Sequence, residues 1–153
     1  MMQVHLYSDG GCFDHGPNKG RGAWAYILVD NQDNMVHSDS QLVETETTNN
    51  RMEYISFMEG LKYCLDNMGK QTYVTAYIDS QLLVNTWNTW LKGWIAKGIV
   101  QNKANPDLLT EMSTLKKTLN ENQIFLTLKW VRGHSGNKWN EECDRMCTKA
   151  FNS

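Results

Sequence analysis

Three segments with strand character come before the first helical pattern in this 153-residue chain. Residues 3–9, 22–30 and 34–44 are rich in alternating, β-branched or aromatic side chains, as in strands. A glycine-rich turn follows Asp9, and a short polar turn joins the second segment to the third. Because such turns join neighbouring antiparallel strands, we expect the chain to begin as an antiparallel meander.

Helical and strand patterns alternate over the rest of the chain. Helical patterns span residues 47–69, 105–120 and 139–153, and a further one begins at Ser80. Gly69 is expected to close the first helix, and Asn105 to cap the helix at 105–120. Strand patterns span residues 72–79 and 124–131. Strands that alternate with helices form parallel crossovers. The sequence therefore predicts an α/β fold, with a five-stranded mixed sheet and helices on both of its faces.

Composition fits one domain, predicted to span residues 1–153. Hydrophobic residues make up 41% of the chain, enough for a substantial core, and no linker or repeat is present. The formal charge of −2 excludes a protein that coats nucleic acid through bulk positive charge. The first residues lack the apolar segment of a signal peptide, and no run approaches the ~20 apolar residues of a membrane span. We expect a cytoplasmic protein.

The four cysteines are Cys12, Cys64, Cys143 and Cys147. They lack paired CxxC spacing, and thiols stay reduced in the cytosol, so we expect four free and mostly buried side chains. Cys143 and Cys147 lie four residues apart in a predicted helix, which leaves a metal site as the alternative. Without further cysteine or histidine ligands nearby, that alternative is weak.

Four carboxylates stand at element ends or on helices: Asp9, Glu53, Asp79 and Asp144. Each has a simpler interpretation, as a turn former, a partner of the helix dipole, a helix cap and a solvated side chain respectively. However, the first and fourth strands are expected to be parallel neighbours, which brings Asp9 and Asp79 together at the edge where α/β sheets bind ligands.

Carboxylates gathered at one point repel each other unless a cation neutralises them. Hard oxygen ligands, with no histidine pair or cysteine pattern, favour Mg²⁺, or Mn²⁺ in its place. Four negative charges balance two Mg²⁺ ions. Two such metal ions side by side support in-line displacement at phosphorus, so the sequence predicts phosphodiester hydrolysis.

Four motifs then carry a family resemblance: "YSDGGC" (7–12), "TTNNRMEY" (47–54), "YIDSQ" (77–81) and "WVRGHSGNKWNEECD" (130–144). In this order and spacing the chain resembles type 1 ribonuclease H. The resemblance implies a ribonuclease H-like sheet of strand order 3-2-1-4-5. It also implies an enzyme that cuts the RNA strand of RNA–DNA hybrids and leaves 5′-phosphate and 3′-hydroxyl ends. The oligomeric state stays open, and we favour a monomer.

The resemblance also implies roles for single residues. Asp9, Glu53, Asp79 and Asp144 match the family's metal-binding acids, with Asp9 bridging two ions. His134 matches a loop histidine that helps proton transfer or product departure; its simpler interpretation is an ordinary exposed side chain. The same pattern implies that Asn140 and Glu141 orient either His134 or the outer metal shell.

Substrate contacts are implied in the same way. The 2′-hydroxyl groups in the minor groove distinguish RNA from DNA. The family pattern places against the RNA strand the turn at Gly10, Gly11 and Cys12, with Glu53 and Gln81. Thr48 would hold a DNA phosphate, with Asn49 and Asn50 nearby, although Asn50 is also a competent helix cap. Gly11 departs from the family, which often has serine there.

A tryptophan-rich segment that contains Trp87, Trp90 and Trp94 matches the family's basic handle, which contacts DNA. Tryptophans at this spacing are more often core residues, so we expect at least two to be packed inside. The handle is weakly basic, with Lys92, Lys97 and Lys103, and carries Ile99 where an aromatic residue is common. The residues predicted to contact substrate here are Trp90, Lys92, Lys97 and Asn105.

Two other functions remain open. Integrases, transposases and junction resolvases use related acidic sites on DNA, but they seldom carry the histidine loop or a handle. A ribonuclease H-like module that only binds nucleic acid would have lost its acids, whereas all four are present here. Cleavage of hybrid but not of duplex DNA distinguishes the first alternative, and binding without cleavage would indicate the second.

Overall fold

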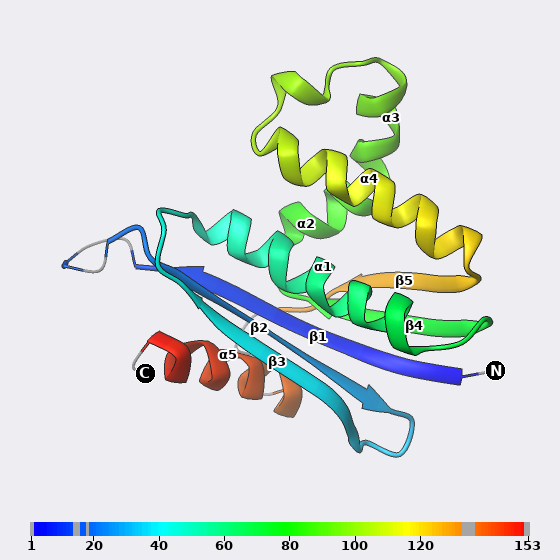
Figure 1. Cartoon of the computed structure of the whole chain (residues 1–153), viewed down its shortest axis with the longest axis horizontal. Coiled ribbons are helices and arrows are strands. Elements are labelled where there is room, and N and C mark those ends of the chain that lie inside the picture. The colour runs from blue at the N-terminus through cyan, green and yellow to red at the C-terminus, as the bar shows by residue number, and fades with distance from the viewer. Residues whose placement is uncertain (1, 14–15, 18, 133–136, 152–153) are drawn as a thin grey trace.

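A computed structural model describes residues 2–13, 16–17, 19–132 and 137–151 of the chain. Its centre is one five-stranded sheet of order β3-β2-β1-β4-β5 (Figure 1). The strands are β1 (Met2–Cys12), β2 (Gly22–Asp30), β3 (Met35–Val43), β4 (Thr72–Ile78) and β5 (Ile124–Trp130). The first three pair antiparallel, and β4 runs parallel to both β1 and β5. The predicted mixed sheet and its strand order are confirmed.

Helices cover both faces of this sheet (Figure 1). On one face lie α1 (Asn49–Asn67) and α4 (Pro106–Glu121), together with α2 (Gln81–Asn85) and α3 (Leu91–Ala96). A π-helical turn, η1 (Thr86–Trp90), joins α2 to α3, and a short 3₁₀ turn, η2 (Val100–Asn102), precedes α4. On the opposite face, α5 (Lys138–Phe151) packs across β1, β2 and β3.

Two layers of apolar side chains result because successive residues of a strand point to opposite faces. Leu6 of β1 joins Phe57 and Leu61 of α1 in the large core beneath α1 and α4. Its neighbour Tyr7 faces the other way and packs with Cys143 of α5. The helix on the second face is therefore anchored directly to the strand that carries Asp9.

The ends of several elements differ from the sequence prediction. β1 continues past Asp9 to Cys12, because Gly10, Gly11 and Cys12 pair with residues 22–24 of β2 instead of forming a turn. The first helix ends before Gly69, with Met68 as its cap in an extended conformation. The helix predicted from Ser80 has only five α-helical residues before the backbone widens into η1.

The cysteines and tryptophans lie largely as predicted. All four cysteines are free, with Cys12 half-buried and the other three buried. Trp87 lies in the core and Trp94 is partly buried against it, whereas Trp90 is 39% exposed. Across the part of the chain that the structure describes, no helix is both long and apolar enough to cross a membrane.

Candidate active site

Three of the predicted acids meet at the ends of β1 and β4. Asp9 extends from β1, Glu53 from the first turns of α1, and Asp79 from the residue after β4. One carboxylate oxygen from each lies within 4.8 Å of the others. The parallel pairing of β1 with β4 brings the two strand ends together, as the sequence predicts. We call Asp9, Glu53 and Asp79 the acidic cluster.

Gly10 allows α1 to approach β1 closely enough to form this cluster. A Cβ atom at Gly10 would lie 2.4 Å from the backbone carbon of Met52, which no real structure tolerates. Met52 directly precedes Glu53, so a side chain at position 10 would push the Glu53 backbone away from Asp9. The glycine is therefore required by packing. Gly11 has ample space, since the nearest atom to its added Cβ, Asn49 Oδ1, would be 3.7 Å away.

Both helices that flank the acidic cluster are capped by hydroxyl side chains. Thr48 Oγ1 accepts a hydrogen bond from Arg51 N, and Ser80 Oγ accepts one from Leu83 N. The helix-cap interpretation of Asp79 is therefore wrong, because Ser80 does that work one residue later. The cap interpretation of Asn50 is wrong as well, because Asn50 lies inside α1 after Thr48.

Burial and mutual repulsion make the acidic cluster hard to ionise. Burial, followed by the charge of Asp79, raises the pKa of Asp9 to about 7, and the charge of Asp144 adds to this. Burial, followed by the charges of Asp79 and Asp9, raises the pKa of Glu53 well above its ordinary value. Bringing negative charges together in a dehydrated site costs free energy, which a bound cation would offset.

The donor set fits a hard divalent metal ion. Every member of the acidic cluster is a carboxylate, and Glu53 Oε2 is buried with no hydrogen-bond partner among the described residues. Such an oxygen is normally paired, so it has spare capacity for a cation. Trp130, from the end of β5, fixes the backbone beside the cluster, because its Nε1 donates to the Asp79 carbonyl oxygen over 3.1 Å.

Asp144 lies near the acidic cluster but outside it. Its side chain is exposed on α5, and it is not among the three carboxylates that share the 4.8 Å limit. Two thiols hold the same helix against β1: Cys143 Sγ donates to the Tyr7 carbonyl oxygen, and Cys147 Sγ to that of Asp9. The position of α5 therefore sets how far Asp144 stands from Asp9.

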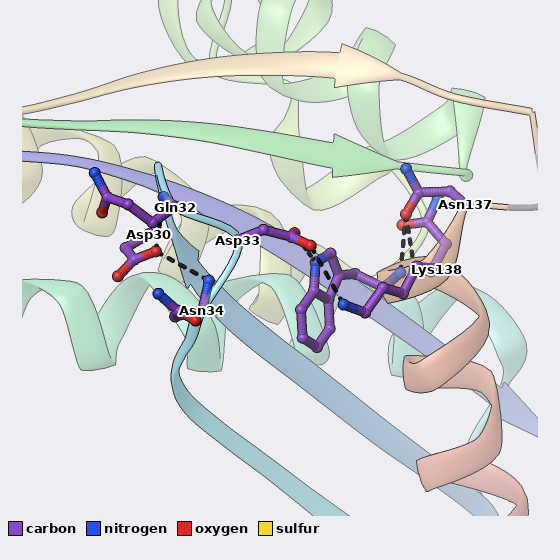
Figure 2. Close-up of polar contacts among 8 residues, drawn as sticks. Asp30, Gln32, Asp33, Asn34, Asn137 and Lys138 are labelled. Carbon is purple, nitrogen blue, oxygen red and sulfur yellow. Dashed lines mark hydrogen bonds and ion pairs between the residues drawn. The ribbon is translucent and has the colours of Figure 1, made fainter.

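The turn between β2 and β3 contacts the start of α5 (Figure 2). Asp33 accepts a 2.6 Å hydrogen bond from Trp139 Nε1 and forms a 3.3 Å ion pair with Lys138. Asn137 Oδ1 caps the helix by accepting hydrogen bonds from the backbone N–H groups of Trp139 and Asn140. No signal in the sequence predicted that Asp33 would reach α5.

His134 lies outside the described residues, so its predicted role stays a prediction. The two residues expected to orient it are on the first turn of α5. The Asn140 side chain is half-buried, and its Oδ1 has no hydrogen-bond partner within residues 2–13, 16–17, 19–132 and 137–151. Glu141 is exposed, and its backbone N–H donates to the Asn137 carbonyl oxygen.

The residues predicted to contact RNA surround the acidic cluster. Gly10, Gly11 and Cys12 form the last residues of β1, and Asn49 Oδ1 accepts a 2.7 Å hydrogen bond from Cys12 N. This bond ties the strand end to the start of α1. Asn50 and Gln81 are exposed at the first residues of α1 and α2. These residues therefore lie on β1, α1 and α2, which are the elements that carry or directly follow the three acids.

The handle, residues 86–104, presents Trp90 to solvent. The Trp90 ring stacks on Trp94 with centroids 5.8 Å apart, and Lys103 Nζ lies 4.9 Å from the centroid of Trp94. Lys92 and Lys97 are exposed. The aromatic pair is thus a small platform, with one ring free to meet a ligand.

Arg51 connects the active-site helix α1 to the start of α4, directly after the handle, a role that sequence reasoning missed. Its guanidinium forms a bidentate pair with Asp107 at 3.0 and 2.8 Å, and it donates to Asn105 Oδ1 over 3.2 Å. Asn105 occupies the N-cap position of α4, as predicted, in a left-handed conformation with φ of 57°, but its side chain makes no capping hydrogen bond to the described residues. Arg51 lies within the motif "TTNNRMEY", and its place in that motif is the sequence signal that could have indicated this role.

The sheet order and the acidic cluster together define an α/β protein of the ribonuclease H-like class. The chain belongs to the RNase H family, whose model matches residues 1–152. The enzyme class predicted from the motifs, ribonuclease H, is confirmed by this match and by the relatives.

Curated relatives cover nearly the whole chain. Ribonuclease H of Campylobacter jejuni is 34% identical over 150 residues, which is 98% of this chain and 92% of that protein. Ribonuclease H of Francisella philomiragia is 35% identical over 152 residues, covering 97% and 90% respectively.

Solved structures support the fold. RNase H1 of Halobacterium salinarum has a TM-score of 0.69 at 21% identity, with 98% of each chain covered. LC11-RNase H1 in complex with an RNA/DNA hybrid has a TM-score of 0.65 at 20% identity, with 97% of this chain and 96% of that chain covered. At these identities the two structures establish the fold alone.

Proposed function

We propose that this protein is an endonuclease that hydrolyses the RNA strand of RNA–DNA hybrids with two Mg²⁺ ions, leaving 5′-phosphate and 3′-hydroxyl ends. The observation that carries the proposal is the acidic cluster, in which Asp9, Glu53 and Asp79 bring carboxylate oxygens within 4.8 Å. Membership of the RNase H family supports the choice of substrate, as does a neighbour of the same fold that is in complex with an RNA/DNA hybrid.

Asp9, Glu53, Asp79 and Asp144 would hold the metal ions, with Asp9 shared between them. Mg²⁺ would supply an activated water and neutralise charge on the leaving oxygen, and Mn²⁺ would substitute for it. The raised pKa values of Asp9 and Glu53 support this role, because a cation lowers the cost of ionising both groups. Asp144 completes the set from α5.

The remaining residues bind substrate or move protons. His134 would shuttle a proton or help the product leave, and Asn140 and Glu141 would orient it. Gly10, Gly11, Cys12 and Gln81 would contact the RNA strand, where 2′-hydroxyl groups mark it as RNA. Asn49 and Asn50 would meet the nucleic acid nearby. On the DNA strand, the proposed contacts are Thr48, Trp90, Lys92, Lys97 and Asn105. We propose that residues 1–153 act as one catalytic domain, as a monomer in the cytoplasm.

One gel assay tests the proposal. Labelled hybrid, duplex DNA and duplex RNA are each incubated with the protein, with and without Mg²⁺ or Mn²⁺. We expect metal-dependent cleavage of the RNA strand in hybrid and none in the two duplexes. Cleavage of duplex DNA would instead favour the integrase-like alternative, and hybrid binding without cleavage would favour a binding module.

Asp79→Asn tests the acidic cluster within the same assay. This change keeps the size of the side chain but removes one charge from the proposed metal site. We expect cleavage to fall by orders of magnitude while hybrid binding, measured by filter retention, persists. Near-normal cleavage by this variant would exclude the proposed metal site. Asp66→Asn, which alters an exposed carboxylate of α1 away from the cluster, is the matched control.

A further inference from the structure

A cavity of about 560 Å³ lies where the handle meets α4 and the start of β5. We call it the handle cavity. Its walls are largely apolar, with Trp87 and Leu91 from the handle and Phe125 from the sheet. Ile95 and Phe125 are 42% and 39% exposed, although both are large apolar side chains. The cavity thus leaves open to solvent an apolar surface that a ligand would cover.

Positive charge lines this cavity without matching negative charge. Lys92, Lys116 and Lys117 contribute to the walls, and no Asp or Glu is among the described residues that line it. Lys117 already has a counterion, since its Nζ lies 4.0 Å from Glu121 Oε1. The excess charge therefore belongs to Lys92 and Lys116.

Lys116 is held in place and is partly dehydrated. Its Nζ donates to the Trp87 carbonyl oxygen over 2.7 Å and lies 5.0 Å from the centroid of the Trp87 ring. Burial, and then the nearby charge of Lys92, lower the pKa of Lys116. Two ammonium groups that repel each other beside an apolar wall would both be stabilised by one anion.

The handle cavity is separate from the acidic cluster. Ile124, on its wall, pairs with Thr72 at the start of β4, whereas Trp130 pairs with Ile78 at the opposite end, next to Asp79. Trp130 lies six residues after Ile124 along β5, which is about 20 Å along a strand. A ligand in the cavity therefore has no direct contact with the proposed metal site.

We propose that the handle cavity binds a small apolar carboxylate, with its ring or alkyl body against Trp87, Leu91 and Phe125 and its carboxylate between Lys92 and Lys116. The volume lies within the ~300–1,000 Å³ range of small-molecule sites, and an apolar cavity with a few polar groups is their usual form. Charge-assisted hydrogen bonds from the two lysines would supply the preference for an anion.

Binding would also compete with the DNA strand for Lys92. This consequence rests on the proposed function, in which Lys92 contacts the hybrid from the handle. A carboxylate that engages Lys92 would withdraw its charge from DNA while leaving the acidic cluster unchanged. The ligand would therefore raise KM for hybrid without changing kcat.

Calorimetric titration of the full chain tests binding directly. The probes are naphthalene-2-carboxylate and its neutral isostere, 2-naphthamide. We expect the carboxylate to bind at least ~10-fold more tightly, because charge-assisted bonds are about twice as strong as neutral ones. Lys116→Met and Lys92→Met, which keep an apolar stem, should each remove most of this preference. Lys149→Met, on α5, is the matched control and should keep it.

Several outcomes would overturn the site. These are equal affinity for the two probes, no binding of either probe, or a preference that survives both lysine changes. Inorganic phosphate at the same concentration distinguishes an apolar-carboxylate site from a general anion site, and displacement of the carboxylate by phosphate would also overturn the proposal.

Hybrid cleavage provides a separate readout of the competition. Naphthalene-2-carboxylate should raise KM in the natural protein, and Lys116→Met should reduce that effect. If the protein binds the carboxylate but cleaves no hybrid, the cavity stands and the proposed function fails. If it cleaves hybrid but shows no charge preference in titration, the cavity proposal alone fails.

Discussion

The Asp33 carboxylate, in the turn between β2 and β3, accepts a 2.6 Å hydrogen bond from Trp139 Nε1, on the first turn of α5. The same carboxylate pairs with Lys138, whose Nζ lies 4.4 Å from the centroid of the Trp139 ring. The hydrogen bond and the neighbouring charge of Lys138 lower the pKa of Asp33, so it remains ionised at neutral pH. A sheet turn thus contacts the helix that carries Asp144.

Replacing Asp33 by Ala should weaken metal binding more than it affects folding. Loss of both contacts frees the start of α5, so Asp144 would be held less firmly beside Asp9. We expect the Mg²⁺ concentration for half-maximal cleavage to rise several-fold. The midpoint of urea unfolding should fall only modestly, because alanine is strained at the φ of 64° found here. Asp33→Asn should keep the Mg²⁺ concentration for half-maximal cleavage close to that of the natural protein. Its amide oxygen still accepts from Trp139 Nε1, and asparagine tolerates the φ of 64° at this position. An unchanged Mg²⁺ requirement in Asp33→Ala would show that the turn does not position α5.

Gly10→Ala should damage both stability and activity. The new methyl group would lie 2.4 Å from the Met52 backbone carbon, so α1 must shift away from β1. Overpacking of this kind costs typically 1–3 kcal/mol, and the shift would also separate Glu53 from Asp9. We expect a lower unfolding midpoint in urea and at least ~10-fold slower hybrid cleavage. Gly11→Ala, with 3.7 Å to its nearest neighbour, is the matched control for stability. An equal fall of the unfolding midpoint in the two variants would contradict the steric argument.

The sequence predicted the mixed sheet and the meeting of Asp9 with Asp79 because both follow from periodic patterns and parallel pairing, whereas the strand order was predicted from the family resemblance. It missed the continuation of β1 through Gly10 and Gly11, because glycines indicate a turn unless a partner strand pairs with them. It also missed Asp33. That contact joins residues 106 positions apart and depends on the angle of α5 across the sheet, which local sequence does not encode.

Without metal, the protein should lose stability as the pH rises from about 4 to 7. Burial and the neighbouring acids raise the folded-state pKa of Asp9 from 3.8 to about 7, and that of Glu53 rises as well. Between the unfolded and folded pKa values the folded state binds more protons than the unfolded state, so the free energy of unfolding falls with pH in that window. The lowered pKa values of Asp33 and Asp107 act below pH 4, outside it.

Urea unfolding at pH 5 and pH 8 in the presence of a chelator measures this loss. We expect it to exceed about 1.4 kcal/mol, the value of a single pKa unit. Saturating Mg²⁺ should restore stability at pH 8 much more than at pH 5, and Asp79→Asn should reduce the dependence on pH. A metal-free protein that is equally stable at both pH values would contradict the repulsion inferred for the acidic cluster.

Binding to hybrid should depend only moderately on salt. The handle offers Lys92, Lys97 and Lys103, and the whole chain carries a formal charge of −2, so few phosphates would be neutralised. With about 3–5 phosphate contacts, the logarithm of the association constant should fall against the logarithm of salt concentration with a slope between about −2 and −4. Fluorescence anisotropy with Asp79→Asn and labelled hybrid in Ca²⁺ measures the slope without cleavage.

In that background Lys97→Met should make the slope shallower by about 1, because one phosphate contact is lost. Lys149→Met, on the opposite face of the sheet, should leave it unchanged. A slope steeper than about −6 would mean that cations outside the handle dominate binding.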